Sequence, residues 1–305
     1  MTPSSPDRGT GDRGAPAARE VTPSLLRGWA LPAPSDSKYS RGQVLIIGGA
    51  ARTPGAVQLA GLAALRVGAG HLTMAVAESA AVAMAVATPE AGVAGLPQNA
   101  RGSVLGGDLS AIADDLGSAQ VVTVGVGLDD PDETALLLQN LVPQLSEDAW
   151  LVLDAYALGV LPGLDEDLLA PVRGRLVLTP NSQEATRLLG RDLGEGEQRE
   201  EDVREIAARY GAVVSCSGAV ANAAGDLWRI GAGNGGLATS GSGDVLVGAV
   251  AGLVGRTGDG DQAACWGTHV HAAAGDRLAA RVGTLGFLAR ELLPELPVVL
   301  SELGT

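Results

Sequence analysis

The feature that most constrains the fold of this chain is a regular alternation of two kinds of segment, which begins near Gln43. Short runs rich in Val, Leu and Ile alternate with longer runs rich in Ala and Leu. Short strands that are apolar on both faces are typical of a parallel sheet that helices cover on both sides. We therefore predict a three-layer α/β/α fold with a mainly parallel central sheet.

The alternation also predicts where the elements lie. Strands are expected at Val44–Ile47, Leu72–Val76, Val121–Val124, Leu151–Leu153, Leu176–Leu178 and Val213–Ser215. Helices are expected at Gly55–Val67, Ser79–Ala87, Glu133–Leu141, Gln183–Leu189, Glu201–Arg209, Ser242–Val254 and Asp261–Arg281. The segment Ala221–Ile230 breaks the pattern and predicts a hairpin that turns near Gly225.

The N-terminal segment differs in composition from the rest of the chain. Residues 1–20 are polar, charged and rich in Pro and Gly, so we predict a disordered tail there. Because no linker or internal repeat is found after residue 42, we predict a single domain over residues 21–305. The first twenty residues also lack a signal peptide, and no apolar run approaches a membrane span, so a cytoplasmic protein is expected.

The charge balance excludes some partners. The formal net charge is −14, which argues against nucleic acid or an anionic membrane as a partner. Lys38 is the one lysine, so a phosphate site would rely on backbone amides, a few local cations or Mg²⁺.

Cys216 and Cys265 lack metal-ligand spacing and are interpreted as buried small residues. His269 and His271, two apart in a predicted helix, do not share a face and are not predicted to form a metal site.

A glycine-rich block runs from Asn234 to Leu253 and reads NGGLATSGSGDVLVGAVAGL. Its glycines surround Asp244, and an apolar helical run follows at once. Glycines let the backbone approach a ligand, and the first turn of a helix favours phosphate. An aspartate there would repel the anion, so it fits better as a base toward a hydroxyl, or as a metal partner. The alternative is a glycine-rich loop with an N-capping aspartate.

Other loops follow the predicted strands. In parallel sheets, ligands bind beyond the carboxyl ends of the strands, so these loops should share one edge. Each loop also has a purely structural interpretation as a tight turn or a helix cap, with Asn181 or Ser182 as the cap before Glu184. The loops contain Gly48-Gly49, Gly125-Val126-Gly127, Asp154 and Thr179-Pro180-Asn181.

In their order and spacing, these segments resemble the family of ADP- or ATP-dependent (S)-NAD(P)H-hydrate dehydratases, which has the ribokinase-like fold. The resemblance runs from about Val21 to Glu302. The segments that carry it are Ser40-Arg41-Gly42, VLIIGGAARTPGA, Thr88-Pro89-Glu90, GVGL, LVLDAYAL, LTPNSQEATRLLG, the Asn234–Leu253 block and THVHAAAGD.

The resemblance implies that the protein is a lyase. In the reaction it implies, ADP or ATP phosphorylates the ring hydroxyl of NAD(P)H hydrate, and phosphate then leaves. It implies that Asp244 is the base, that Mg²⁺ neutralises the nucleotide phosphates, and that the protein is a homo-oligomer, often a tetramer. From its position one step into a predicted helix, Glu184 is expected near the metal-bound phosphates. It places the hydrate against Ala56, Gly127, Asn181 and Asp244. It places the nucleotide against Ser217, Gly218, Ala219, Val220, Ala221, Gly241, Ser242 and Gly243.

The chain departs from the family pattern in four loops. Asn181 stands where the family usually has His, and Ser217 where it usually has Lys. Tyr156 stands in place of an Asp, and Val126 in place of a Pro. Losing the lysine removes a cation beside the nucleotide. Two alternatives therefore stay open: a catalytically impaired homologue that still binds nucleotide, and a ribokinase-like kinase of a small alcohol.

Overall fold

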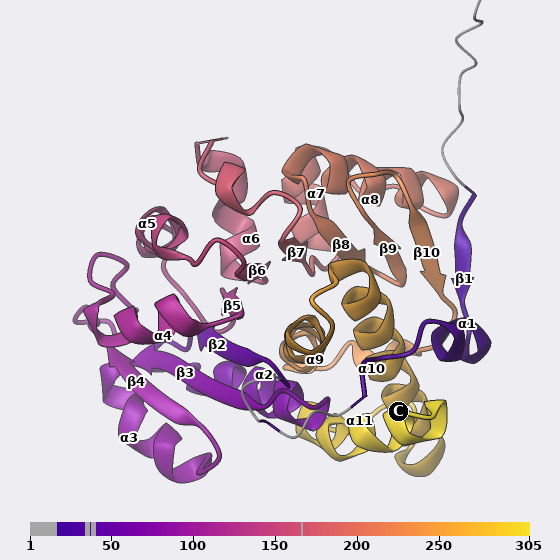
Figure 1. The fold of residues 1–305 in the computed structure, drawn as a ribbon, viewed down its shortest axis with the longest axis horizontal. Helices are drawn as coiled ribbons and strands as arrows, with labels where there is room; N and C mark the ends of the chain where they lie inside the picture. The colour runs from indigo at the N-terminus through magenta and orange to yellow at the C-terminus, as the bar shows by residue number, and fades with distance from the viewer. Residues whose placement is uncertain (1–16, 34–36, 38–40, 166) are drawn as a thin grey trace, which may run out of the picture.

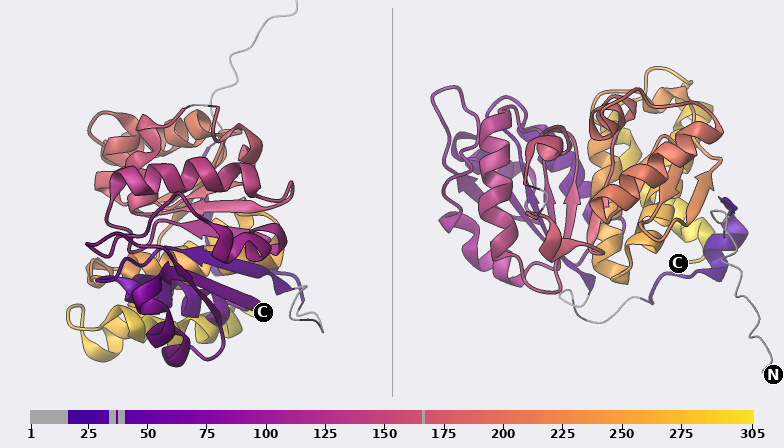
Figure 2. Two further views of the ribbon diagram at one scale, coloured as in Figure 1. Left: turned by 90° about the vertical axis from the view of Figure 1, so that its left-hand side faces the viewer. Right: turned by 90° about the horizontal axis from the view of Figure 1, so that it is seen from above.

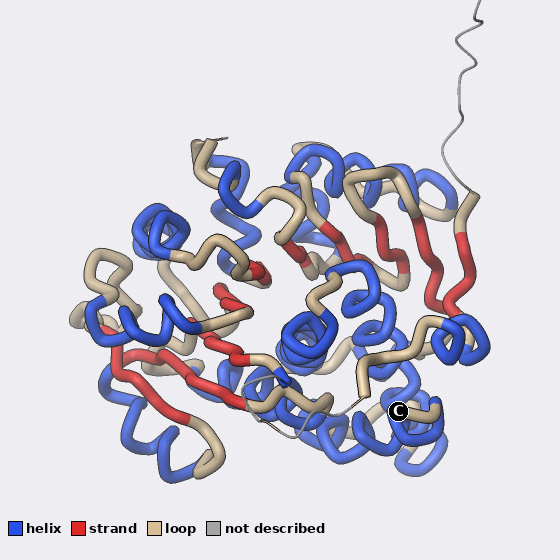
Figure 3. Tube along the Cα trace, in the orientation of Figure 1, coloured by secondary structure: helices blue, strands red, loops and turns tan. Residues whose placement is uncertain are grey.

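The computed structural model describes residues 17–33, 37, 41–165 and 167–305. Residues 1–16 of the predicted tail, together with Lys38 and Ser40, lie outside the described residues. Within the described part, a single ten-stranded sheet runs through the molecule in the order β1-β10-β9-β8-β7-β6-β5-β2-β3-β4 (Figures 1 and 3). The strands are β1 (Arg19–Val21), β2 (Gln43–Ile47), β3 (His71–Ala77), β4 (Gly92–Leu96), β5 (Val121–Val124), β6 (Trp150–Leu153), β7 (Leu176–Leu178), β8 (Val213–Cys216), β9 (Ala219–Ala221) and β10 (Leu227–Ile230).

Helices cover both faces of the sheet, and each face has its own apolar core (Figure 2). One layer contains α1 (Pro23–Gly28), α2 (Pro54–Arg66), α3 (Glu78–Ala87), α9 (Ser242–Thr257), α10 (Gly260–Val282) and α11 (Ala289–Leu303). The other contains α4 (Ala113–Ser118), α5 (Pro131–Leu141), α6 (Tyr156–Val160), α7 (Ser182–Leu189) and α8 (Glu197–Tyr210). The predicted three-layer α/β/α fold is therefore confirmed.

The parallel part of the sheet positions the site. β3, β2, β5, β6, β7 and β8 are neighbours and run parallel, so their carboxyl ends meet at one edge of the sheet. All six predicted strands fall within this set. The side chains of β5 and β6 are almost fully buried, as their continuous apolar runs require.

The predicted hairpin is also present, as β9 and β10, which pair antiparallel. Its turn is held by Asn222, whose Oδ1 accepts hydrogen bonds from the amides of Ala224 (3.1 Å) and Asp226 (3.0 Å). The hairpin extends the sheet beyond β8, and β9 begins two residues earlier than predicted.

One boundary of the predicted tail was wrong. Arg19 and Glu20 belong to β1, which pairs in parallel with β10 about 200 residues further along the chain. The Arg19 guanidinium lies over the Trp228 ring, 4.7 Å from its centroid, and pairs with Asp226 at 2.7 Å. A strand of three residues gains its partner only in the folded chain, so local composition could not reveal it.

Besides β1, the strands and α-helices that were not predicted are α1, α4, α6, β4 and α11. The residues of β4 and α11 explain why. β4 contains Gly92 and Gly95, which have low strand propensity, and it forms one edge of the sheet. α11 contains Pro294 and Pro297 inside the helix, where proline normally interrupts the hydrogen-bond ladder.

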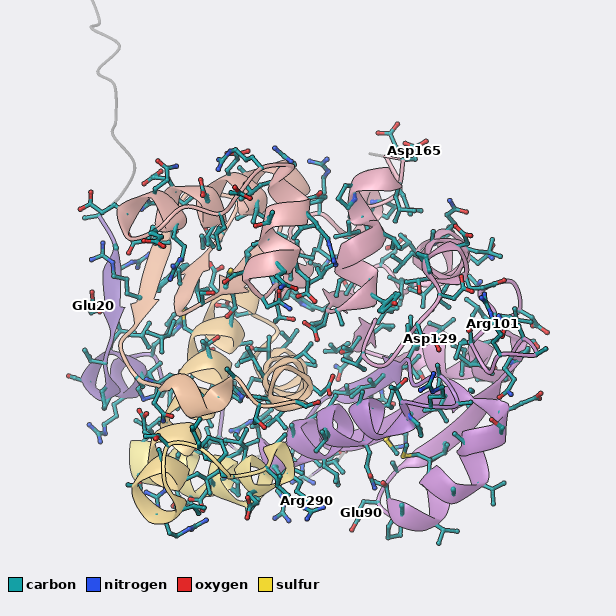
Figure 4. The ribbon with its side chains drawn as sticks, turned by 180° about the vertical axis from the view of Figure 1, so that it is seen from behind. Glu20, Glu90, Arg101, Asp129, Asp165 and Arg290 are labelled. Atoms are coloured by element: carbon teal, nitrogen blue, oxygen red, sulfur yellow. The ribbon has the colours of Figure 1, made fainter. Side chains whose placement is uncertain are left out.

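Several charged side chains, among them Arg101 and Arg290, lie around the outside of the molecule (Figure 4). In the described part of the chain, no helix combines the length and apolarity needed to cross a membrane.

Candidate functional site

The first turn of α9 lies among the loops at the carboxyl edge of the sheet. Gly241 adopts a left-handed φ of +88° as the chain enters the helix. A Cβ atom there would lie 2.7 Å from Leu59 Cδ1, so only glycine fits this close turn. Ser242 is buried, whereas Gly243 is exposed. Because the first amides of a helix lack intrahelical acceptors, this turn can donate hydrogen bonds to an anion.

Asp244 is the third residue of α9. Burial raises the pKa of its carboxyl group to about 6. At neutral pH the group is therefore mainly a carboxylate, yet a stronger base than an exposed aspartate. This combination suits a residue that accepts a proton from a hydroxyl group.

The loops after β2 and β5 are tied to each other. Gly49 donates its amide to Val126 O (2.8 Å), and Ala50 donates its amide to Gly127 O (2.8 Å). The Thr53 hydroxyl donates to the same Gly127 oxygen at 2.7 Å. These bonds fix the relative positions of the two loops.

Ala56 and Gly127, two of the predicted substrate-binding residues, are brought together by these loops. A Cβ atom at Gly127 would lie 3.0 Å from Ala56 Cβ and 2.5 Å from Thr53 O. Gly127 also has a φ of +68°, which favours glycine. The result is a tightly packed backbone surface beside α2, with little side-chain bulk over it.

Asp154, at the end of β6, is buried, and the Thr179 hydroxyl donates to its Oδ1 at 2.7 Å. Burial raises the pKa of Asp154 well above its usual range, and the charges of Glu184 and Asp244 raise it further. These three acids come from β6, α7 and α9, so the fold concentrates acidic groups at this edge. The sequence did not identify Thr179 as the partner of Asp154, although its place directly after a strand was visible.

Asn181 caps α7. Its Oδ1 accepts hydrogen bonds from the amides of Gln183 (2.9 Å) and Glu184 (3.0 Å). In return, Glu184 Oε2 accepts from the Asn181 amide at 2.9 Å, which completes a capping box. The capping interpretation is confirmed, with Asn181 rather than Ser182 as the cap. Burial raises the pKa of Glu184.

Ser217 follows β8 and faces the start of α7. Its hydroxyl lies 3.1 Å from the Ser182 hydroxyl. Ser217 has a φ of +48°, and among the non-glycine residues of the described chain only Ala155 also has a positive φ, of +51°. Both lie in loops at the carboxyl edge, and non-glycine residues in this region carry strain that is often found at ligand sites.

The predicted nucleotide-binding residues divide into two groups. Ser217 and Gly218 lie in the loop after β8, with at least part of their surface exposed. Ala219, Val220 and Ala221 form β9, which is paired on both sides, and their side chains are buried. These three residues therefore offer no exposed side chain to a nucleotide. Within the described ranges, no group of three or more His, Cys, Asp or Glu side chains is arranged to hold a metal ion.

The strand order, the two helical layers and the glycine-flanked acid at the start of α9 define a ribokinase-like α/β protein. The fold is similar to that of a ribokinase-like superfamily protein from Enterococcus faecalis, with a TM-score of 0.79. That similarity has 23% sequence identity and covers 94% of this chain and 96% of the other.

Sequence comparisons identify a family within the ribokinase-like class. A family model described as NAD(P)H-hydrate dehydratase matches residues 44–298. The chain is 44% identical to the ADP-dependent (S)-NAD(P)H-hydrate dehydratase of Xanthomonas campestris, over 94% of this chain and 98% of that protein. The chain therefore belongs to the NAD(P)H-hydrate dehydratase family, as its motifs indicated.

A solved structure and longer relatives complete the comparison. The ADP/ATP-dependent NAD(P)H-hydrate dehydratase of Bacillus subtilis, co-crystallised with ATP and Mg²⁺, is 25% identical with a TM-score of 0.77. The similarity covers 94% of this chain and 99% of that one. The chain spans about half the length of the bifunctional NAD(P)H-hydrate repair enzymes that it also matches.

Proposed function

We propose that this chain is an ADP- or ATP-dependent (S)-NAD(P)H-hydrate dehydratase, a lyase that restores NAD(P)H from its hydrate. The observation that carries the proposal is Asp244, an acid in the first turn of α9 whose pKa is raised to about 6 by burial. Family membership supports the substrate class.

The reaction begins with the ring hydroxyl of the hydrate. The Asp244 carboxylate accepts the hydroxyl proton as the hydroxyl oxygen bonds to the terminal phosphorus of the nucleotide. The bond from that phosphorus to the bridging oxygen breaks, which releases AMP from ADP or ADP from ATP. The C–O bond between the ring and the phosphorylated oxygen then breaks, and its electron pair leaves with phosphate. The adjacent ring carbon loses a proton to solvent, and the ring double bond returns.

Several residues support this step in the proposed arrangement. The amides around Gly241, Ser242 and Gly243 donate to the phosphoryl oxygens as negative charge develops on them. The hydrate lies against Ala56, Gly127 and Asn181. Ser217 and Gly218 contact the nucleotide, with Ala219, Val220 and Ala221 behind them.

A magnesium ion fits this edge as a partner of the nucleotide rather than of the protein. Mg²⁺ prefers oxygen ligands and often takes most of them from water and substrate phosphates. That preference agrees with the lack of a three-ligand protein cluster among the described residues. Glu184, with one oxygen outside the capping box, would hold the ion through water, and the ion would neutralise phosphate charge.

One assay tests the function. The purified chain is incubated with NADH hydrate, Mg²⁺ and either ADP or ATP, and the recovery of NADH absorbance is followed. We expect recovery that is lost in Asp244→Asn. Nucleotide binding without recovery would instead indicate an impaired homologue, and nucleotide consumption only with another alcohol would indicate a kinase. The predicted homo-oligomer and cytoplasmic location stay predictions.

A further inference from the structure

The segment that follows β10 and runs into the first turn of α9 contains the catalytic loop, which we define as residues 233–244. Asp276, on α10, holds its first residues. The Gly233 amide donates to Asp276 Oδ2 at 2.8 Å, and Asn234 Nδ2 donates to Asp276 Oδ1 at 2.9 Å. Asn234 Oδ1 accepts in turn from the Gly236 amide at 2.8 Å. The start of the loop is therefore fixed to α10.

His271, five residues before Asp276 on α10, contacts the other end of the loop. Its Nε2 atom lies 3.0 Å from both the hydroxyl oxygen and the carbonyl oxygen of Ser242. Both residues are buried. Five residues of helix span about 7.5 Å, so a single rigid element holds the loop at two separated points.

The chemistry of these contacts assigns the proton on the His271 ring. A carbonyl oxygen only accepts hydrogen bonds, so Nε2 must carry a hydrogen to bond it. Burial lowers the pKa of His271 to about 4, so near neutral pH the ring is uncharged with its proton on Nε2. The ring thus donates to Ser242 without placing a positive charge behind the first turn of α9.

Small residues let the loop lie close to its support. A Cβ atom on Gly275 would lie 2.6 Å from Leu237 Cδ2, and one on Gly236 would lie 2.6 Å from Phe287 Cε1. Leu237 in the middle of the loop therefore packs directly against α10. Hydrogen bonds at both ends and close packing between them leave the loop little freedom.

We propose that His271 is a positioning residue: by donating to Ser242 it fixes the first turn of α9, and thereby Asp244 and the adjacent amides, while Asp276 holds the far end of the loop. The effect on turnover rests on the proposed function. Fixed donors and a fixed base act mainly in the transition state, so their misplacement lowers kcat more than it weakens binding.

Three variants of the full chain test this role. His271→Leu removes the donor, whereas His271→Gln keeps an amide donor that reaches Ser242. His269→Leu is the matched control, because His269 is also buried on α10 and its Nδ1 has no partner among the described residues. For each variant we would measure kcat, the KM for nucleotide, the unfolding midpoint and hydrogen exchange of the peptide that contains residues 233–244.

We expect His271→Leu to lower kcat roughly ten- to a hundredfold, with a change in KM below about threefold and faster exchange of the loop amides. His271→Gln should recover most of both losses, and His269→Leu should match the wild type. The proposal would be overturned by wild-type kcat and exchange in His271→Leu, or by equal losses in all three variants. If His271→Leu does not fold, His271→Asn, whose shorter amide does not reach Ser242, replaces it.

The hydrogen-exchange measurement tests the positioning role of His271 separately from the proposed function. If the wild-type chain does not convert the hydrate, the proposed function fails, and loop exchange alone then decides the role of His271. Faster exchange in His271→Leu that His271→Gln reverses would support positioning, and unchanged exchange would refute it.

Discussion

Two regions of the carboxyl edge differ in how they are built. The catalytic loop keeps the glycine-and-aspartate pattern of its family and is bonded at both ends to α10. The facing loops, at the start of α7 and after β8, carry Asn181 and Ser217 in place of the usual His and Lys. There, a capping box and a contact between two hydroxyls stand where charged side chains are expected. In the proposed arrangement, the chain thus retains the groups assigned to the transferred phosphate, while two residues assigned to the hydrate and the nucleotide differ from the family pattern.

The largest expected effect concerns the retained region. Asp244→Asn keeps the shape of the side chain but removes the proposed base, and we expect kcat to fall by about a thousandfold. The assay is recovery of NADH absorbance from NADH hydrate with ADP or ATP.

The control for Asp244→Asn is a measurement of its unfolding temperature. Because burial raises the pKa of Asp244 in the folded state, ionisation opposes folding at pH 7, and this opposition is relieved as the pH falls below about 6. Asp244→Asn should therefore unfold at or above the wild-type temperature at pH 7. Lost activity with a lower unfolding temperature would point to misfolding instead.

A smaller effect is expected in the altered region. In the proposed arrangement, Ser217→Lys places a cation beside the nucleotide, and a charge-assisted hydrogen bond of about 1.5–3 kcal/mol corresponds to at least a tenfold lower KM. Ser182→Ala is the matched control, because it breaks the same hydroxyl contact without adding charge. An unchanged KM in folded Ser217→Lys would mean that the nucleotide does not approach this loop.

The smallest effect concerns the cap of α7. Asn181→Ala removes the acceptor for two helix amides and should reduce the free energy of unfolding by about 1 kcal/mol. Denaturant unfolding measures this change. Gln183→Ala, an exposed neighbour in the same turn, should change it by less than about 0.5 kcal/mol. Equal losses in the two variants would contradict a specific cap.

Sequence patterns identified the parts of this fold that depend on neighbouring residues. The strands β2, β3 and β5 to β8 were visible because each is a short, mainly apolar run, and Asp244 because glycines and a helix surround it. What stayed hidden depends on distant partners. β1 needs β10, Asp154 needs Thr179, and His271 acquires its role only when α10 packs beneath the catalytic loop.

One motif shows this limit clearly. THVHAAAGD was recognised as part of the family pattern, and its two histidines were considered only as metal ligands. The structure gives them different surroundings, with His271 bonded to Ser242 and the Nδ1 atom of His269 unpaired within the described chain. Residues two apart on a helix point in different directions, so sequence spacing excluded a shared metal but could not assign a partner to either.

The most direct test of the central claim is the pH dependence of kcat/KM for the wild-type chain with NADH hydrate and saturating nucleotide. If Asp244 is the base, the rate should be constant above about pH 7 and fall tenfold per pH unit below an apparent pKa near 6. A rate that remains constant down to pH 5 would contradict a base with the raised pKa of Asp244.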